Sequence, residues 1–278
     1  MGRSLSTRRT AGTHTGEPPV PAYGQANASA GWARRQALAR AAQRAGVTGV
    51  AVLLACALGF GLLMLATPSP DNARELAATF DQAHGAPYPG VPVPFRFAAA
   101  LEATEDHRFN SEPGIDPVAV LRVVYGAMAR RGDQGGATLY QQLAKMLYTP
   151  GNSSMRAEAE QIALAVKLKY AYSRPEILRL YADVAYFGHG FYGLAEASCG
   201  YFGVPSGQMS WPQAALLAGL VQGPTADDPI DHPAAGRARE EHVIGRLVAV
   251  GALSQGAAAR YLRTPVGGLM AHAGACRG

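Results

Sequence analysis

A long run of mainly apolar residues extends from Val47 to Ala66, and no charged residue falls within these 20 positions. At a rise of about 1.5 Å per residue, a helix of this length spans about 30 Å, the thickness of the hydrocarbon core of a bilayer. A buried core helix is the alternative, but such helices usually carry a polar face. The pattern therefore predicts one transmembrane helix over 47–66.

The segment before this run, residues 1–46, is basic and contains seven arginines and a single acidic residue, Glu17. It is rich in Gly, Ala, Thr and Pro, a composition that predicts disorder. It is also far too long for the basic start of a cleaved signal peptide. The positive-inside bias places this tail in the cytoplasm and everything after Ala66 outside. The anionic surface near the tail is then a membrane rather than nucleic acid.

Beyond the apolar run, residues 67–94 are rich in proline and predict a linker with a short helical piece near Asp71–His84. From Phe95 onward amphipathic helical patterns dominate, with little β-branched alternation. The sequence therefore predicts an all-α domain over 95–278.

Several helix boundaries can be placed within this domain. Asp116 followed by Pro117 marks one N-terminus, and the pairs Ser173–Glu176 and Ser210–Gln213 have capping-box spacing. Helices are expected over 94–109, 116–131, 138–148, 154–171, 173–187, 214–221 and 234–251, and a last short helix near residue 254.

The three cysteines have no CxxC spacing, which argues against a zinc site or a disulfide framework. Cys56 lies in the apolar run. Cys199 and Cys276 fall in the part expected outside the cytoplasm, where disulfides can form, but the sequence leaves their pairing open.

The first candidate for chemistry is the acidic pair Glu105–Asp106 in the stretch ALEATEDHRF. Glu105 and Phe109 are four residues apart and share a helix face. A carboxylate beside apolar residues tends to have a raised pKa, which suits a general base. A solvated helix face is the alternative reading, and Glu102 is an equal rival for the role.

The second candidate is the stretch QGGATLYQQLAK, in which Gly135 and Gly136 lead into a helix N-terminus. Free backbone N–H groups at such a terminus favour an anion. Thr138, Gln142 and Lys145 then form one polar face that suits a phosphate-bearing ligand. An ordinary amphipathic helix is the alternative, and the spacing of a P-loop is absent.

Two further stretches complete the set. Arg156 and Glu160 are four residues apart, which alone predicts an intrahelical ion pair. The glycines and aromatic residues of Ser173–Gly203 suggest tight helix packing rather than chemistry.

The order of these stretches, EDxxFxxxxG, GGxTxxQQLAK, RxxxE, EILxxYxxxxYFGxGxYGxxxAxxxYFG and LLAGLxQxP, resembles the peptidoglycan glycosyltransferase domain of glycosyltransferase family 51. That domain occurs in bifunctional penicillin-binding proteins and in monofunctional enzymes. The resemblance covers about residues 95–251. It implies a lysozyme-like α-helical fold with a small, partly membrane-immersed jaw, here at about 110–135. Since no sequence follows Gly278, it also implies a monofunctional protein.

The resemblance implies that lipid II is polymerised into β-1,4-linked glycan strands by inverting transfer, with release of a polyprenyl pyrophosphate. Glu105 matches the family's catalytic base, and Glu160 matches its second acid. The positions implied to bind substrate are Asp106, Phe109, Arg122, Gly135, Gly136, Thr138, Gln141, Gln142, Lys145 and Arg156.

The expected partners are lipid II, the growing glycan strand and the bacterial cytoplasmic membrane, with a transpeptidase and division or elongation proteins as further candidates. No nucleic acid is expected. A divalent cation, Mg or Mn, could assist with the pyrophosphate, although no dedicated ligand cluster stands out.

Five positions depart from the family pattern, which usually has His, Ser, Thr, Lys and Asn where this chain has Glu112, Ala137, Tyr140, Ala157 and Asp183. Ala137 removes a hydroxyl from the expected anion site, and two other departures make that site less basic. A weakly active or non-catalytic relative that binds lipid intermediates is therefore an alternative. A lysozyme-type hydrolase is a third reading, disfavoured by the GGxTxxQQ stretch and the membrane anchor.

Overall fold

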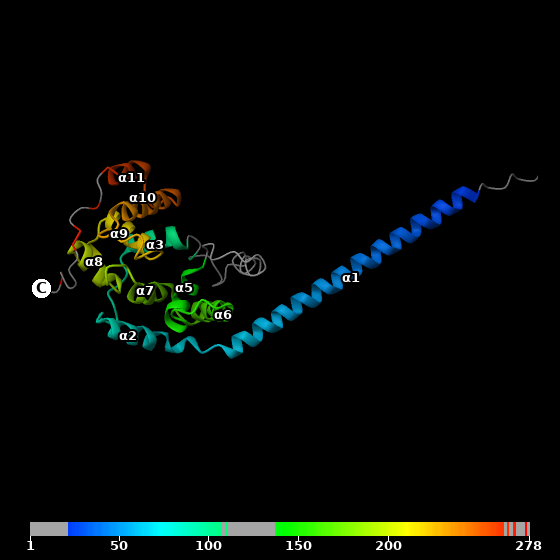
Figure 1. The fold of residues 1–278 in the computed structure, drawn as a ribbon, viewed down its shortest axis with the longest axis horizontal. Helices are drawn as coiled ribbons and strands as arrows, with labels where there is room; N and C mark the ends of the chain where they lie inside the picture. Colours follow the sequence, from blue (N-terminus) through cyan, green and yellow to red (C-terminus); the bar gives the residue numbers. More distant parts are fainter. Residues whose placement is uncertain are drawn as a thin grey trace, which may run out of the picture. The chain divides into compact units, whose positions relative to one another are not determined.

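The computed structural model describes residues 22–106, 109, 137–263, 266, 269, 270 and 276. Within this part of the chain every regular element is a helix, and strand-like pairing is limited to one bridge between Tyr186 and Tyr192 (Figure 1). The predicted all-α class is confirmed. The expected jaw with its helix over 116–131, and the positions Glu112, Arg122, Gly135 and Gly136, lie outside the described residues.

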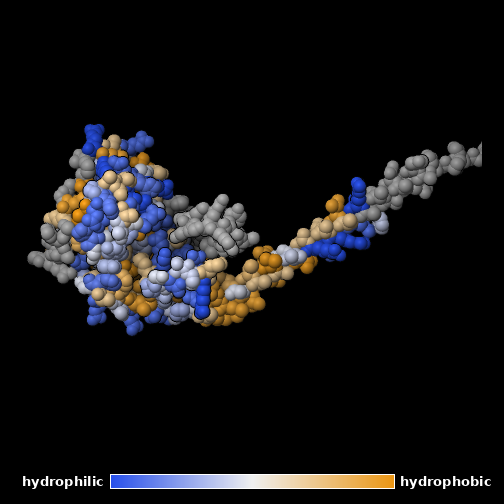
Figure 2. Space-filling view, in the orientation of Figure 1, coloured by the Kyte–Doolittle hydropathy of each residue, from blue (hydrophilic) through white to orange (hydrophobic). Residues whose placement is uncertain are grey.

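The first helix, α1 (Ala22–Ala66), contains the predicted span. In the described part of the chain it is the one helix long and apolar enough to cross a membrane, judged by length and composition over Arg34–Ala66. Figure 2 shows apolar side chains along the half of α1 that ends at Ala66. Residues 22–46, whose composition predicts disorder, are helical, because Ala, Gln and Arg are good helix formers.

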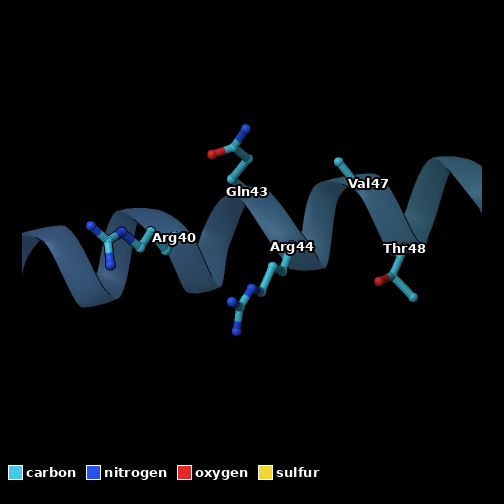
Figure 3. A pocket seen from close by; sticks show the side chains of 5 residues that line it. All are labelled: Arg40, Gln43, Arg44, Val47 and Thr48. Carbon is cyan, nitrogen blue, oxygen red and sulfur yellow. The ribbon is translucent and has the colours of Figure 1, made fainter.

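The boundary between the basic and apolar parts of α1 is abrupt. Figure 3 shows Arg40, Gln43 and Arg44 on the turns that precede Val47 and Thr48. Long basic side chains at the end of a span can extend their charges to the headgroup region. This pattern agrees with the start of a span near Val47.

The remaining helices follow in short succession. Their bounds are α2 (Ala73–His84), α3 (Phe95–Glu105), α5 (Leu139–Tyr148), α6 (Met155–Ala171), α7 (Arg174–Val184), α8 (Leu194–Phe202), α9 (Trp211–Leu220), α10 (Pro233–Ala249) and α11 (Gln255–Tyr261), with short 3₁₀ turns η1 (Pro70–Asn72) and η2 (Ser206–Gln208). All the expected helices of the described region are present, and α2 is the short helical piece expected near 71–84.

Helix α8 is the element that the hydrophobic pattern does not predict. It is buried on several sides, so its sequence lacks an amphipathic period. Gly200 shows how closely it packs, since a Cβ atom there would lie 2.3 Å from the ring of Phe191. The glycine-rich, aromatic character of this stretch reflects that packing.

The helices form two groups that share one core (Figure 1). Helix α3 packs against α9 and α10, while α5 packs against α6 and α7. The wholly buried run 214–220 of α9 lies in the first group. Asp106, the residue that follows α3, accepts a hydrogen bond from the backbone N–H of Leu139 at the start of α5, at 3.1 Å. The C-terminus of α3 and the N-terminus of α5 therefore meet, and this junction holds Glu105.

One predicted capping box is confirmed and the other is wrong. Ser210 and Gln213 exchange side-chain and backbone hydrogen bonds at the start of α9. Ser173 begins α7 without a side-chain cap. Glu176 instead forms an ion pair with Arg74 of α2, whose guanidinium lies 2.5 Å from the Glu176 carboxylate. A tertiary ion pair has replaced the local motif.

A disulfide joins Cys199 of α8 to Cys276 near the C-terminus, while Cys56 in α1 is free and exposed. The cysteine spacing argues against a disulfide framework, and the structure corrects this to a single bridge. Sequence separation alone gives no information on whether two side chains 77 residues apart meet.

Two acidic side chains are buried where α2 packs against α7. Asp81 is fully buried, and neither of its carboxyl oxygens has a hydrogen-bond partner among the described residues. Asp183 is also buried and accepts a 3.3 Å hydrogen bond from the backbone N–H of Gly90. Burial, together with the charge of Asp183, raises the pKa of Asp81 to about 7. Burial raises the pKa of Asp183 to about 6, against the opposing effect of Gly90 and Arg179.

Asp81→Asn should therefore stabilise the fold at pH 8 and have little effect at pH 4. Between about pH 4 and 7 the folded chain holds a proton on Asp81 that the unfolded chain has released, so stability falls as pH rises through this window. One pKa unit corresponds to about 1.4 kcal/mol, so the melting temperature at pH 8 should rise by at least about 4 °C. Thermal unfolding in detergent measures this. Glu75→Gln, an exposed change on the same helix, should give no such rise, and an Asp81→Asn protein no more stable than wild type at pH 8 contradicts the account.

Candidate active site

Glu105 is the last residue of α3, and its side chain is partly buried against α5. The amide nitrogen of Gln142 donates a 3.1 Å hydrogen bond to its carboxylate. The same nitrogen lies 3.3 Å from the backbone carbonyl of Ala137. The carboxylate is thus held from one side by an amide that belongs to a packed helix.

Tyr181 of α7 fixes this amide in turn. Its hydroxyl donates a 2.8 Å hydrogen bond to the side-chain oxygen of Gln142, and the tyrosine itself is buried. Since the hydroxyl occupies the amide oxygen, the amide nitrogen of Gln142 must face Glu105. The sequence motifs do not identify Tyr181 as a site residue. A buried tyrosine hydroxyl usually has a partner, and this is the signal that could have indicated it.

Burial is the main influence on Glu105 and raises its pKa. The hydrogen bond from Gln142 and the electrostatic interactions with Arg239 and His242 on α10 act in the opposite direction. A carboxylate with a raised pKa is a stronger base than one on a solvated surface. The neighbouring rival, Glu102, is half-buried one turn earlier on α3. The oriented bond from Gln142 falls on Glu105, which favours Glu105 as the base.

Most residues around the Glu105 carboxylate have a structural role, because they hold the start of α5 in place. Asp106 and Thr138 bond the backbone N–H groups of Leu139 and Gln141, respectively. Those two donors at the α5 N-terminus are therefore occupied by the protein itself. The ring of Phe109 packs 5.0 Å from that of Tyr140, in the core.

The cations expected to bind substrate lie near the end of α5 and at the start of α6. Lys145 is exposed near the end of α5, one turn beyond Gln142. Arg156 is exposed in the first turn of α6, where its guanidinium lies 2.9 Å from the carboxylate of Glu160. Because α5 and α6 are successive helices that pack together, both cations lie at the end of the pair where the chain turns. The candidate site residues are thus spread along the length of α5, with Glu105 beside its N-terminus and Lys145 and Arg156 near its C-terminus.

The departures from the family pattern fall in different places. Tyr140 and Ala157 are buried, so neither reaches the exposed face with Lys145 and Arg156. Asp183 faces Gly90 at the contact between α2 and α7. Ala137 contributes its carbonyl to Gln142.

Among the described residues, one group has side chains close enough to hold a metal ion: His189, Asp228 and Asp231. None of these is a candidate for chemistry. Glu160, the second candidate acid, is paired with Arg156. The described candidates around Glu160 do not form a ligand set for Mg or Mn.

Comparison with known proteins gives one family and a set of relatives. A family model described as transglycosylase matches residues 74–248. A Cupriavidus necator protein named as a putative transglycosylase is 31% identical over 164 residues, which cover 59% of this chain and 71% of that protein. Penicillin-binding protein 1A of Aquifex aeolicus is 35% identical over 57% of this chain, and penicillin-binding protein 2a of Streptococcus pneumoniae is 37% identical over 55%. The matches cover only 22% and 20% of these two longer relatives.

Proposed function

Because this chain belongs to the transglycosylase family of peptidoglycan glycosyltransferases, we propose that it polymerises lipid II into β-1,4-linked glycan strands and releases a polyprenyl pyrophosphate. The family accounts for the all-α, lysozyme-like fold and for glycosyl transfer in peptidoglycan synthesis. The observation that carries the proposal is the half-buried Glu105, oriented by Gln142 and Tyr181.

In the proposed reaction Glu105 takes the proton from the 4-hydroxyl of the acceptor sugar. The hydroxyl oxygen attacks the anomeric carbon of the lipid-linked donor from the face opposite the pyrophosphate. The new carbon–oxygen bond forms as the bond to the pyrophosphate oxygen breaks, which inverts the anomeric centre. The electron pair leaves with the pyrophosphate, and the proton remains on Glu105 until solvent removes it.

The leaving pyrophosphate gains negative charge, so cations near it lower the barrier. Lys145 and Arg156, both exposed, are the described cations proposed for this role. Arg156 also bonds Glu160 and would orient that second acid toward the donor. Arg122, Gly135 and Gly136 remain proposed contacts on the basis of the motif alone.

The anchor and the disulfide support an extracytoplasmic domain. The apolar part of α1 follows arginines, and the Cys199–Cys276 bridge suits an oxidising compartment. We therefore propose a single-pass protein whose glycan product is used outside the cytoplasm, with a transpeptidase as the partner that would cross-link it. A reporter fused after Gly278 that is active in the cytoplasm would exclude this topology.

Purified protein incubated with lipid-linked disaccharide should produce a ladder of glycan chains on a gel. Retained binding of the donor without a ladder would instead favour a non-catalytic relative. Cleavage of preformed glycan strands without polymerisation would favour a hydrolase. The intact network around Glu105 favours the first outcome.

A further inference from the structure

The backbone that directly follows the membrane span is held by side chains of the catalytic domain. The ammonium of Lys167 on α6 donates hydrogen bonds to the carbonyls of Thr67 at 2.7 Å and Pro68 at 3.0 Å. Thr67 itself bonds back to Leu63 in the last turn of α1. A cation at this position satisfies carbonyls left free at the C-terminus of a helix and complements its dipole.

Two tyrosines hold the next residues. The hydroxyl of Tyr172 lies 2.8 Å from the carbonyl of Pro70 and 3.1 Å from that of Asp71. The hydroxyl of Tyr148 lies 3.1 Å from the side-chain oxygen of Asn72 and 3.3 Å from the carbonyl of Pro70. Each hydroxyl has one proton, so each donates to one of its two acceptor oxygens at a time. Together Tyr148, Lys167 and Tyr172, called the anchor clamp below, hold a proline-rich segment that the sequence alone reads as a linker.

A neighbouring ion pair reinforces this arrangement. Arg74, which follows the clamped segment, bonds Glu176 on α7 at 2.6 Å. Its guanidinium also lies 5.1 Å from the centre of the Tyr172 ring. The segment from Thr67 to Arg74 is therefore fastened to α5, α6 and α7 at several points.

Helix geometry connects the anchor clamp with the candidate site. Arg156, Glu160 and Lys167 occupy positions i, i+4 and i+11 of α6, which fall within about 40° of one another around the helix axis. Glu160 and Lys167 are seven residues apart, which corresponds to about 10 Å along the axis. One edge of α6 thus extends from Lys167, which contacts the residues directly after the membrane span, to Glu160, the acid proposed to lie near the donor.

We propose that the anchor clamp is a positioning device that holds the Arg156–Glu160 edge of α6 at the depth of the lipid headgroups, where the pyrophosphate of a membrane-embedded donor lies. This inference rests on the proposed function, since only a lipid-linked donor requires that depth. Tyr170, 78% exposed and within one turn of Lys167, suits a side chain at the membrane interface.

Without the anchor clamp, the segment after the membrane span would be a free linker, and the distance that the domain could then move from the membrane can be estimated. A released stretch of five residues can extend up to about 17 Å. The domain could then rise from the membrane, whereas the donor pyrophosphate is held there by its polyprenyl chain. Small displacements of reacting groups are costly, so a site held at the wrong height would meet its donor rarely.

The test compares Lys167→Met with wild type in lipid vesicles. Methionine keeps an apolar stem of similar length but cannot donate. For a readout independent of activity, a donor dye is placed at Met155→Cys, an exposed position in the first turn of α6, in a Cys56→Ser background. Energy transfer to acceptor-labelled lipid headgroups then reports the height of α6 above the membrane.

We expect Lys167→Met to weaken this energy transfer and to raise KM for the lipid-linked donor by about tenfold, while kcat changes less. Lys167→Arg should restore both readouts in part. Arg260→Met, an exposed change on α11, is the matched control and should leave both unchanged. If Lys167→Met does not fold, Tyr172→Phe keeps the ring that packs on Arg74 and is read in the same way.

Unchanged energy transfer in Lys167→Met, or a changed height with an unchanged KM, overturns the positioning role. A wild-type protein that makes no glycan would reject the proposed function instead, and the height measurement would still report on the clamp. The two failures are therefore distinguishable.

Discussion

Replacing Glu105 with Gln should lower the rate of glycan polymerisation by about 10²–10⁴-fold while the protein remains folded. Glutamine keeps the shape of the side chain and can still accept the hydrogen bond from Gln142, but it cannot take a proton from the acceptor hydroxyl. The rate is measured with purified protein and lipid-linked disaccharide, and folding by circular dichroism and thermal unfolding.

Glu102→Gln is the matched control, since Glu102 is a half-buried acid one turn earlier on the same helix. It should reduce the rate far less. Equal losses from both variants, or no loss from Glu105→Gln, would mean that the base is another carboxylate.

The second large effect is expected at the cation that follows Gln142 along α5. Lys145→Ala should reduce use of the lipid-linked donor by about tenfold or more, since a charge-assisted hydrogen bond contributes about 1.5–3 kcal/mol. The side chain is exposed, so its loss should leave the melting temperature nearly unchanged. Donor titration under identical detergent and metal conditions provides the measurement, and a Lys145→Ala protein that polymerises as fast as wild type rejects the proposed pyrophosphate contact.

Ala137→Ser is informative beside this variant, because it restores the hydroxyl that the family usually has. It adds a donor with little volume, so a working but weakened catalyst should gain turnover modestly. A non-catalytic relative should remain inactive, since one hydroxyl does not rebuild a lost mechanism.

The parts of the fold that the sequence predicts are those with a strong local signal. The charge-free run ending at Ala66 and the amphipathic periods of α2, α5 and α7 each determine an element from neighbouring residues. The capping box at Ser210 is likewise local and is present. Helix α8 lacks such a signal because tertiary packing buries several of its faces.

The parts that the sequence does not predict depend on contacts between distant residues. Glu176 has the spacing of a capping box, yet it pairs with Arg74, 102 residues away. Tyr181 enters the candidate site only because α7 packs on α5. Lys167 has the sequence context of an ordinary surface lysine, and its contact with Thr67, 100 residues away, is seen only in the fold. The motifs identify Glu105 as a candidate, whereas its orientation by Gln142 requires the three-dimensional arrangement.

The most direct test of the proposed function compares two products of the wild-type protein, the polyprenyl pyrophosphate released and the disaccharide incorporated into chains. Joining n disaccharides releases n−1 pyrophosphates, so their ratio should approach one as chains lengthen, with no free reducing disaccharide. Pyrophosphate release accompanied by free disaccharide, or no release from a folded and membrane-inserted protein, would contradict glycan polymerisation by this chain.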